Sequence, residues 1–217
     1  MLRTTVLLLC ALVLAACTHT PPRNPMAQWV PSPNHDVRRP TLIVVHFTQQ
    51  GSVEESLHTL RTANSHGRVS SHYLVGKDGS LYQLVADEHR AWHAGAGSWQ
   101  GMGDVNSFSI GIELDNNGSE PFTGPLVETQ QLAPTALNLN ETLLALLEDL
   151  TERWNIPRGN VIGHSDLAPT RKVDPGPLFP WQRLHEAGFG IWPEPALMTD
   201  PPADFDPLLA LERIGYA

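Results

Sequence analysis

The sequence has few cysteines, few basic residues and no hydrophobic run long enough to cross a membrane. Only two cysteines occur among 217 residues, so a disulfide-rich scaffold is excluded. The 14 lysines and arginines are scattered and outnumbered by 23 acidic residues, which argues against a nucleic-acid partner. The apolar stretch from Val6 to Leu14 is shorter than the roughly 20 residues of a transmembrane helix. With 41% hydrophobic and 17% charged residues, the composition is that of an ordinary globular protein.

The first residues are typical of a secreted protein. Arg3 precedes the short apolar stretch, as in a signal peptide, which we place at residues 1–16. The end of that stretch, Leu14-Ala15-Ala16-Cys17, resembles the lipobox of bacterial lipoproteins, in which the cysteine is acylated. The alternative is an ordinary signal peptide that is followed by a cysteine by accident.

The lipoprotein interpretation agrees with the cysteine count. Cys10 lies in the segment that would be removed and Cys17 would carry the lipid, so the folded domain would contain no thiol. The resemblance to Gram-negative lipoproteins also indicates which membrane would hold the anchor. Lipoproteins kept in the inner membrane have Asp directly after the acylated cysteine, whereas this sequence has Thr18. We therefore expect a lipid anchor in the outer membrane, on its periplasmic face.

The pattern beyond residue 16 predicts three further segments. Residues 17–40 are rich in proline and lack apolar periodicity, so they are expected to form an extended tether. Residues 41–190 are expected to form the single catalytic domain. Residues 191–217 are expected to be a tail, with an amphipathic helix from Asp206 to Tyr216.

Strand and helix patterns alternate within the domain, which predicts an α/β fold with a mixed central sheet flanked by helices. Asp78-Gly79 marks a β-hairpin between two short apolar runs. The predicted strands are 41–48, 71–75, 81–85, 108–114 and 161–164, and the predicted helices are 52–63, 140–155 and 178–187.

Two of the ten histidines stand apart because each closes an apolar strand. His46 and His164 hold that position, and α/β proteins place their sites at strand ends. A catalytic zinc takes three protein ligands, so a nearby acidic residue is needed beside the two histidines. Asp174 is the candidate, and the proline that follows it favours an extended backbone at this position. In that backbone Lys172 projects to the same side. Asp166 is the alternative third ligand, but so close to His164 it is better suited to a supporting hydrogen bond.

Five segments in this order resemble the zinc-dependent N-acetylmuramoyl-L-alanine amidases of the amidase type 2 family, which share their fold with peptidoglycan recognition proteins. They are Ile43 to Thr48, Ser71-His72-Tyr73, Ala91-Trp92-His93-Ala94-Gly95, Ser109 to Leu114, and Gly163-His164-Ser165-Asp166 with Arg171 to Gly176.

The resemblance implies a role for each candidate residue. His46, His164 and Asp174 would bind zinc, Glu113 would act as the general base, and Lys172 would stabilise the oxyanion. The activity implied is hydrolysis of the amide between N-acetylmuramic acid and L-alanine in peptidoglycan or muropeptides. Taken singly, Glu113 and Lys172 could equally be solvated surface charges.

A second group is implied to bind substrate. It consists of Trp92, His93, Ala94 and Gly95, with Tyr73 at the rim. An aromatic face can stack on sugar or peptide, and glycine lets backbone amides approach a ligand. The alternative is that the tryptophan only anchors a loop.

Two other functions compete with the amidase. A non-catalytic receptor could bind peptidoglycan on the same fold, although it would be expected to lack a metal ligand. A zinc peptidase acting within the stem peptide would be expected to carry a His-Glu-x-x-His helix, which this sequence does not have. The resemblance also implies a wall-binding domain after the catalytic one in many lipid-anchored relatives, whereas only about 27 residues follow Gly190 here. The sequence leaves open the preference for intact wall or anhydro-muropeptides, the stem-peptide specificity and the oligomeric state.

Overall fold

The computed structural model describes residues 23–37, 40–64, 67–116 and 139–216. The predicted signal peptide and Cys17 lie outside these residues. Within the described part of the chain, no helix is both long and apolar enough to cross a membrane.

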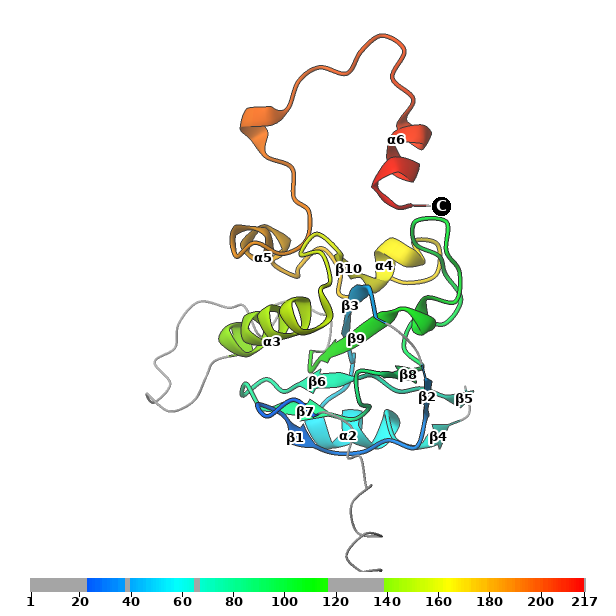
Figure 1. Cartoon of the computed structure of the whole chain (residues 1–217), viewed down its shortest axis with the longest axis vertical. Coiled ribbons are helices and arrows are strands. Elements are labelled where there is room, and N and C mark those ends of the chain that lie inside the picture. The colour runs from blue at the N-terminus through cyan, green and yellow to red at the C-terminus, as the bar shows by residue number, and fades with distance from the viewer. Residues whose placement is uncertain (1–22, 38–39, 65–66, 117–138, 217) are drawn as a thin grey trace, which may run out of the picture.

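A six-stranded mixed sheet forms the centre of the domain (Figure 1), as the sequence predicted. Its strand order is β1-β7-β6-β9-β3-β10. The central strand β3 runs parallel to both of its neighbours, whereas β6 and β7 form the antiparallel hairpin expected around Asp78-Gly79. The strands are β1 Gln28–Trp29, β3 Leu42–Phe47, β6 Tyr73–Val75, β7 Leu81–Gln83, β9 Ser109–Leu114 and β10 Val161–Gly163. Two-stranded ribbons pair β2 His35–Val37 with β8 His89–Ala91, and β4 Ala63–Asn64 with β5 Gly67–Arg68.

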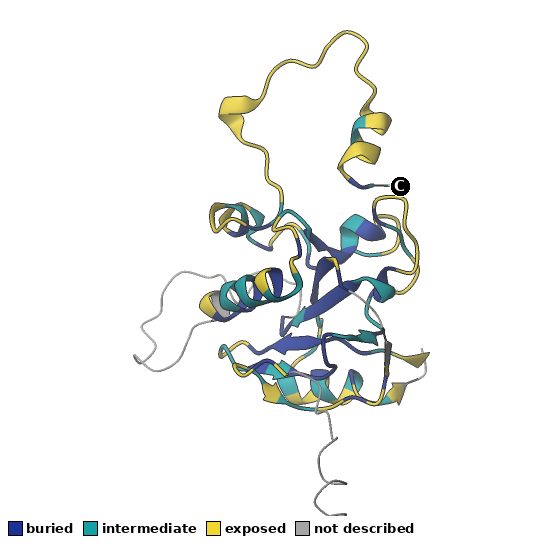
Figure 2. Cartoon of the chain, viewed as in Figure 1, coloured by how far each residue is buried: buried dark blue, intermediate teal, exposed yellow. Residues whose placement is uncertain are grey.

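Helices and loops cover both faces of the sheet, so the central strands are buried on both sides (Figure 2). On one face, α3 (Leu139–Trp154) and α5 (Trp181–Glu186) pack their leucines against Ile43, Val45 and Ile112. The other face carries Leu42 and Val44, and because side chains alternate along a strand, it also carries His46. The site therefore lies on the face opposite α3.

Two helices differ from the sequence prediction in extent, and one strand differs in burial. The helix expected over 52–63 is α2, Val53–Thr59, capped by the Ser52 hydroxyl, and the chain after it turns into β4. The strand at 108–114 was expected to have one core face, but Ser109 and Gly111 are buried as well because the loop after β8 covers them. The last predicted helix is shorter and begins after Pro180.

The prediction of an extended tether at residues 17–40 does not hold for the part that the structure describes. Residues 24–37 pack on the domain: β1 pairs with β7, the Asn24 backbone donates to Gln83 Oε1 at 3.1 Å, and the Ser32 hydroxyl donates to the Leu60 carbonyl at 3.1 Å. The prolines of this segment are compatible with an edge strand, so low apolar periodicity did not mean an unpacked chain.

The tail after the domain contains the short helix η2 Pro195–Leu197, and then α6, Pro207–Ile214, which Asp206 caps and which is shorter than the helix expected from Asp206 to Tyr216. Residues 191–209 are exposed, and the chain returns to the domain at its end (Figure 2). There the Gly215 carbonyl accepts from the Gln100 backbone at 2.7 Å, and the Tyr216 ring packs edge-on against Trp99.

Candidate active site

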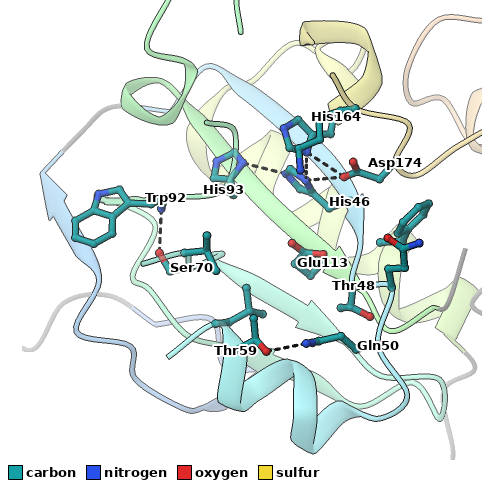
Figure 3. A pocket seen from close by; sticks show the side chains of 15 residues that line it. His46, Thr48, Gln50, Thr59, Ser70, Trp92, His93, Glu113, His164 and Asp174 are labelled. Carbon is teal, nitrogen blue, oxygen red and sulfur yellow. Dashed lines mark hydrogen bonds and ion pairs between the residues drawn. The ribbon is translucent and has the colours of Figure 1, made fainter. Parts of the chain in front are cut away.

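The three predicted metal ligands meet at one point, at the carboxyl ends of two neighbouring parallel strands (Figure 3). His46 lies near the end of β3, and His164 follows β10 as the first residue of α4 (His164–Leu167). Val45 and Gly163 are register partners, so the residues that follow them lie side by side. Asp174 comes from the loop after α4. The Nδ1 atoms of the two histidines and Oδ2 of Asp174 are 3.0 Å from one another in all three pairs.

The donor set fits a zinc ion. Burial lowers the pKa of His46 to about 4, against the opposing effect of its hydrogen bond with Asp174, so its imidazole is neutral at pH 7. His164 Nε2 donates to the Ala94 carbonyl at 2.8 Å, which leaves its Nδ1 without a proton. Two imidazole nitrogens and one carboxylate form a catalytic zinc ligand set, whose atoms lie roughly 3.3 Å apart around a tetrahedral ion. Three buried ligand atoms this close together could hold a metal ion.

Asp166 does not compete for this position. Its Oδ2 accepts from the Gly163 backbone at 2.7 Å, and its Oδ1 accepts from the Tyr216 hydroxyl at 2.5 Å. The Ser165 backbone donates to the Asp174 carbonyl at 2.9 Å, closing the loop that carries the acid ligand. Asp166 thus makes the supporting hydrogen bond that the sequence suggested.

Glu113 lies beside the three ligands with one oxygen free. It is the register partner of His46 on β9, so both side chains project from the same face. Among the described residues, its buried Oε2 has no hydrogen-bond partner. Burial first, and then the charge of Asp174, raises the pKa of Glu113 to about 8, against the opposing effect of Lys172. A carboxyl with a raised pKa beside a metal site is suited to proton transfer.

The side chains of Glu113 and Lys172, the predicted base and the predicted oxyanion-stabilising cation, line one cavity of about 250 Å³. Its lining also includes the three ligands. Other residues that line it include Thr48, Gln50, Thr59, Ser70 and Trp92 (Figure 3). The cavity is therefore a concave polar site with a metal-ligand cluster, a proton acceptor and a cation.

Comparison with known proteins decides the family. Residues 36–177 match the family described as N-acetylmuramoyl-L-alanine amidase, amidase type 2. The chain belongs to this family. The amidase is 40% identical over 161 residues to the N-acetylmuramoyl-L-alanine amidase AmiD of Escherichia coli, an alignment that covers 70% of this chain and 55% of AmiD. It is 36% identical over 180 residues to the 1,6-anhydro-N-acetylmuramyl-L-alanine amidase AmpD of Enterobacter cloacae, covering 73% of this chain and 88% of AmpD.

Solved structures agree on the fold. Escherichia coli AmiD in complex with anhydro-N-acetylmuramic acid-L-Ala-D-gamma-Glu-L-Lys has a TM-score of 0.65 at 34% identity, covering 90% of the amidase and 76% of that chain. AmpDH3 of Pseudomonas aeruginosa has a TM-score of 0.66 at 30% identity, covering 91% and 82%. The chain spans about half the length of curated AmiD but most of the length of AmpD.

Only some of the residues predicted to bind substrate line the cavity. Trp92 and His93 line the cavity, whereas Ala94 and Gly95 do not. The Ala94 carbonyl instead accepts from His164 and, at 2.8 Å, from the Arg171 guanidinium. The Ala94 carbonyl thus orients a predicted metal ligand, and substrate contact by Ala94 and Gly95 stays a prediction. Substrate contact by Trp92 and His93 stays a prediction.

Tyr73 is also wrongly placed by the sequence prediction. Its register partner on β9 is Ile112, so its side chain points to the α3 face, away from Glu113. The ring is fully buried, and its hydroxyl donates to Asp87 at 2.6 Å. Tyr73 belongs to the core and does not reach the cavity. His72 is buried too, with its Nδ1 accepting from the Gly111 backbone.

Sequence reasoning missed the residues that hold the others in place. The Asn106 side chain accepts from the backbones of His93 and Ala94 at 3.0 and 2.9 Å. Arg171 ties the Asp174 loop to the carbonyls of Ala94 and Ala96. Ser109 contacts the His93 ring at 3.1 Å. Arg171 and Ser109 stand inside motifs already singled out, but nothing in a single sequence shows which main-chain groups they contact.

Proposed function

We propose that the amidase is a zinc hydrolase that cleaves the amide between N-acetylmuramic acid and L-alanine in peptidoglycan or soluble muropeptides. The observation that carries the proposal is the convergence of His46, His164 and Asp174 next to an unpaired carboxyl. The named activities of AmiD and AmpD, and the anhydro-muropeptide bound to AmiD, support the same substrate class.

Each side chain in the cavity has a task in this reaction. When bound, zinc supplies Lewis acidity: it lowers the pKa of water and polarises a carbonyl. A bound cation nearby would favour the ionised form of Glu113, and in that form Glu113 accepts the proton of the attacking water and passes it to the leaving amine of L-alanine. Lys172 faces the negative charge that develops on the scissile carbonyl oxygen. Trp92, at the side of the cavity, offers an aromatic face to sugar or peptide.

The rival function is a receptor that binds peptidoglycan without cutting it. The complete ligand set and the free Glu113 carboxyl favour the enzyme, because binding alone requires neither. Purified protein incubated with sacculi and, separately, with soluble anhydro-muropeptides should release free stem peptides, detected by mass spectrometry. Binding to sacculi with no released peptide from either substrate would assign the receptor function.

For the location, we propose a lipid anchor at Cys17 in the outer membrane, on the periplasmic face. The support is the Leu14-Ala15-Ala16-Cys17 segment after a signal-like apolar run, with Thr18 following. An acyl anchor would hold the catalytic domain next to the peptidoglycan layer. The anchor proposal rests on residues 14–18 and the activity proposal on the residues of the cavity, so the two are tested by separate experiments.

A further inference from the structure

We propose that His93 and Ser109 are positioning residues for the metal ligand His46: they determine which of its ring nitrogens carries the proton. His46 Nε2, on the side away from Asp174, is 3.0 Å from His93 Nδ1 (Figure 3). This inference rests on the proposed zinc site and concerns two residues outside the set of metal ligands. It gives His93 a role other than the substrate contact that the sequence suggested.

The direction of each hydrogen bond follows from the serine hydroxyl. Ser109 Oγ donates its one hydrogen to the Val105 carbonyl at 2.7 Å. At 3.1 Å from His93 Nε2, the same oxygen can therefore only accept, so His93 Nε2 carries a proton. In a neutral ring, His93 Nδ1 is then an acceptor, and His46 Nε2 must be the donor.

This arrangement determines the state of His46 Nδ1, the nitrogen that faces the other two predicted metal ligands. With its proton on Nε2, His46 presents a lone pair at Nδ1, the atom that lies 3.0 Å from both His164 Nδ1 and Asp174 Oδ2. His164 reaches the same tautomer by donating directly to the Ala94 carbonyl. Metal-binding histidines commonly donate their second N–H to a carbonyl or carboxylate. His46 instead donates to a second imidazole, that of His93, whose Nδ1 can accept because the His93 proton is held on Nε2, where it donates to Ser109 Oγ.

The backbone of β9 is shaped for this contact. A Cβ atom on Gly111 would lie 2.5 Å from Cγ of the His93 ring, so the ring rests on the glycine. Ser109, Gly111 and Glu113 alternate along one face of β9. On that face, Ser109 orients the ring, Gly111 makes room for it, and Glu113 stands at the cavity.

Zinc affinity of the purified protein, measured by competition with a chromogenic chelator, tests the inference without reference to activity. His93→Leu should weaken zinc binding by about 10- to 100-fold, the usual effect of losing such a partner. His93→Asn should recover most of the affinity, since its amide oxygen can accept near the position of Nδ1. Ser109→Ala should weaken binding less than His93→Leu. The exposed His58 supplies the matched control, His58→Leu, which should bind zinc like the wild type.

Melting of the metal-free variants separates positioning from folding. His93→Leu and His93→Asn should melt alike without metal yet differ in zinc affinity. Equal zinc affinity of His93→Leu and wild type would overturn the positioning role while the proposed function stands. Equal losses in the Leu and Asn variants would reduce His93 to a packing residue and also overturn it. A wild type that binds no zinc would overturn both the metal assignment and this inference.

Discussion

At the scale of single residues, the chemistry depends on where hydrogens and charges are held. His46 is kept neutral by burial, and Glu113 keeps an oxygen free of protein partners among the described residues. A buried carboxyl without a partner costs stability. The molecule tolerates this cost beside a group of metal ligands, where a proton acceptor is useful.

The first prediction concerns Glu113 as the base. Glu113→Gln preserves the size of the side chain but cannot accept a proton, so turnover should fall by roughly 10²–10⁴ while zinc content stays unchanged. Amine release from a defined muropeptide measures the first quantity and atomic emission the second. A Gln variant that turns over at the wild-type rate would move the base role to another group.

A second prediction follows from the raised pKa of the same residue. In metal-free protein the pKa of Glu113 rises from 4.5 to about 8, so between these pH values the folded state keeps a proton that the unfolded state has released. The wild type should therefore lose stability with rising pH relative to Glu113→Gln, by on the order of 1 kcal/mol per pH unit over the steepest part of this range. Urea unfolding of both chelated proteins at several pH values from 5 to 8 measures the difference. A constant difference would show that the Glu113 pKa is not raised.

At the scale of elements, strand ends and register explain why the sequence could predict the site. His46, His164, Asp174, Glu113 and Lys172 were each predicted from motifs at strand ends or in an extended loop, and the structure brings all five to one cavity. The parallel pairing of β3 with β9 and β10 brings together residues 118 positions apart. Period-two alternation placed Glu113 correctly on its strand.

The same reasoning fails where a contact depends on tertiary structure. Tyr73 stands within a matching motif, but its β6 position pairs with Ile112 on the core face. No motif indicated that the Ala94 carbonyl accepts from His164. The proline-rich segment before β3 gave no periodic signal, because a strand of two residues is too short for a pattern to show. It nevertheless pairs with β7. Partners of main-chain groups cannot be read from one sequence.

The third prediction belongs to the element that closes the tail. The Tyr216 hydroxyl donates to Asp166, which also accepts from the Gly163 backbone next to His164. Tyr216→Phe should lower the free energy of unfolding by about 1–2 kcal/mol, because it removes a charge-assisted hydrogen bond. The half-exposed Tyr82 provides the matched control, since Tyr82→Phe removes a hydroxyl for which the described residues offer no partner. Equal stability of the two variants would show that the contact contributes little.

At the scale of the whole molecule, the proposed lipid anchor lies on the N-terminal side of the catalytic domain in the sequence, and the exposed tail from residue 191 onward lies on its C-terminal side. The cavity of the domain is lined by residues on the sheet face away from α3, and the exposed tail returns to the domain through Gly215 and Tyr216. The proposed anchor precedes the described residues. Location and catalysis are therefore separable properties, and each can be changed alone.

The fourth prediction concerns that anchor. Cys17→Ser removes the only thiol at the proposed lipidation site, so the protein should leave the membrane fraction or remain unprocessed. Cell fractionation and the mass of the mature protein measure this, and purified Cys17→Ser protein should retain its catalytic rate. Identical fractionation of wild type and variant would refute the lipid anchor.

The measurement that tests the central claim most directly is zinc titration of chelated protein, followed by counting the amine released from N-acetylmuramoyl-L-Ala peptides. We expect no release without metal and full recovery at one zinc per chain, while His46→Ala, His164→Ala and Asp174→Ala should neither retain zinc nor recover. Undiminished release of the L-alanine amine from fully chelated protein would contradict the account.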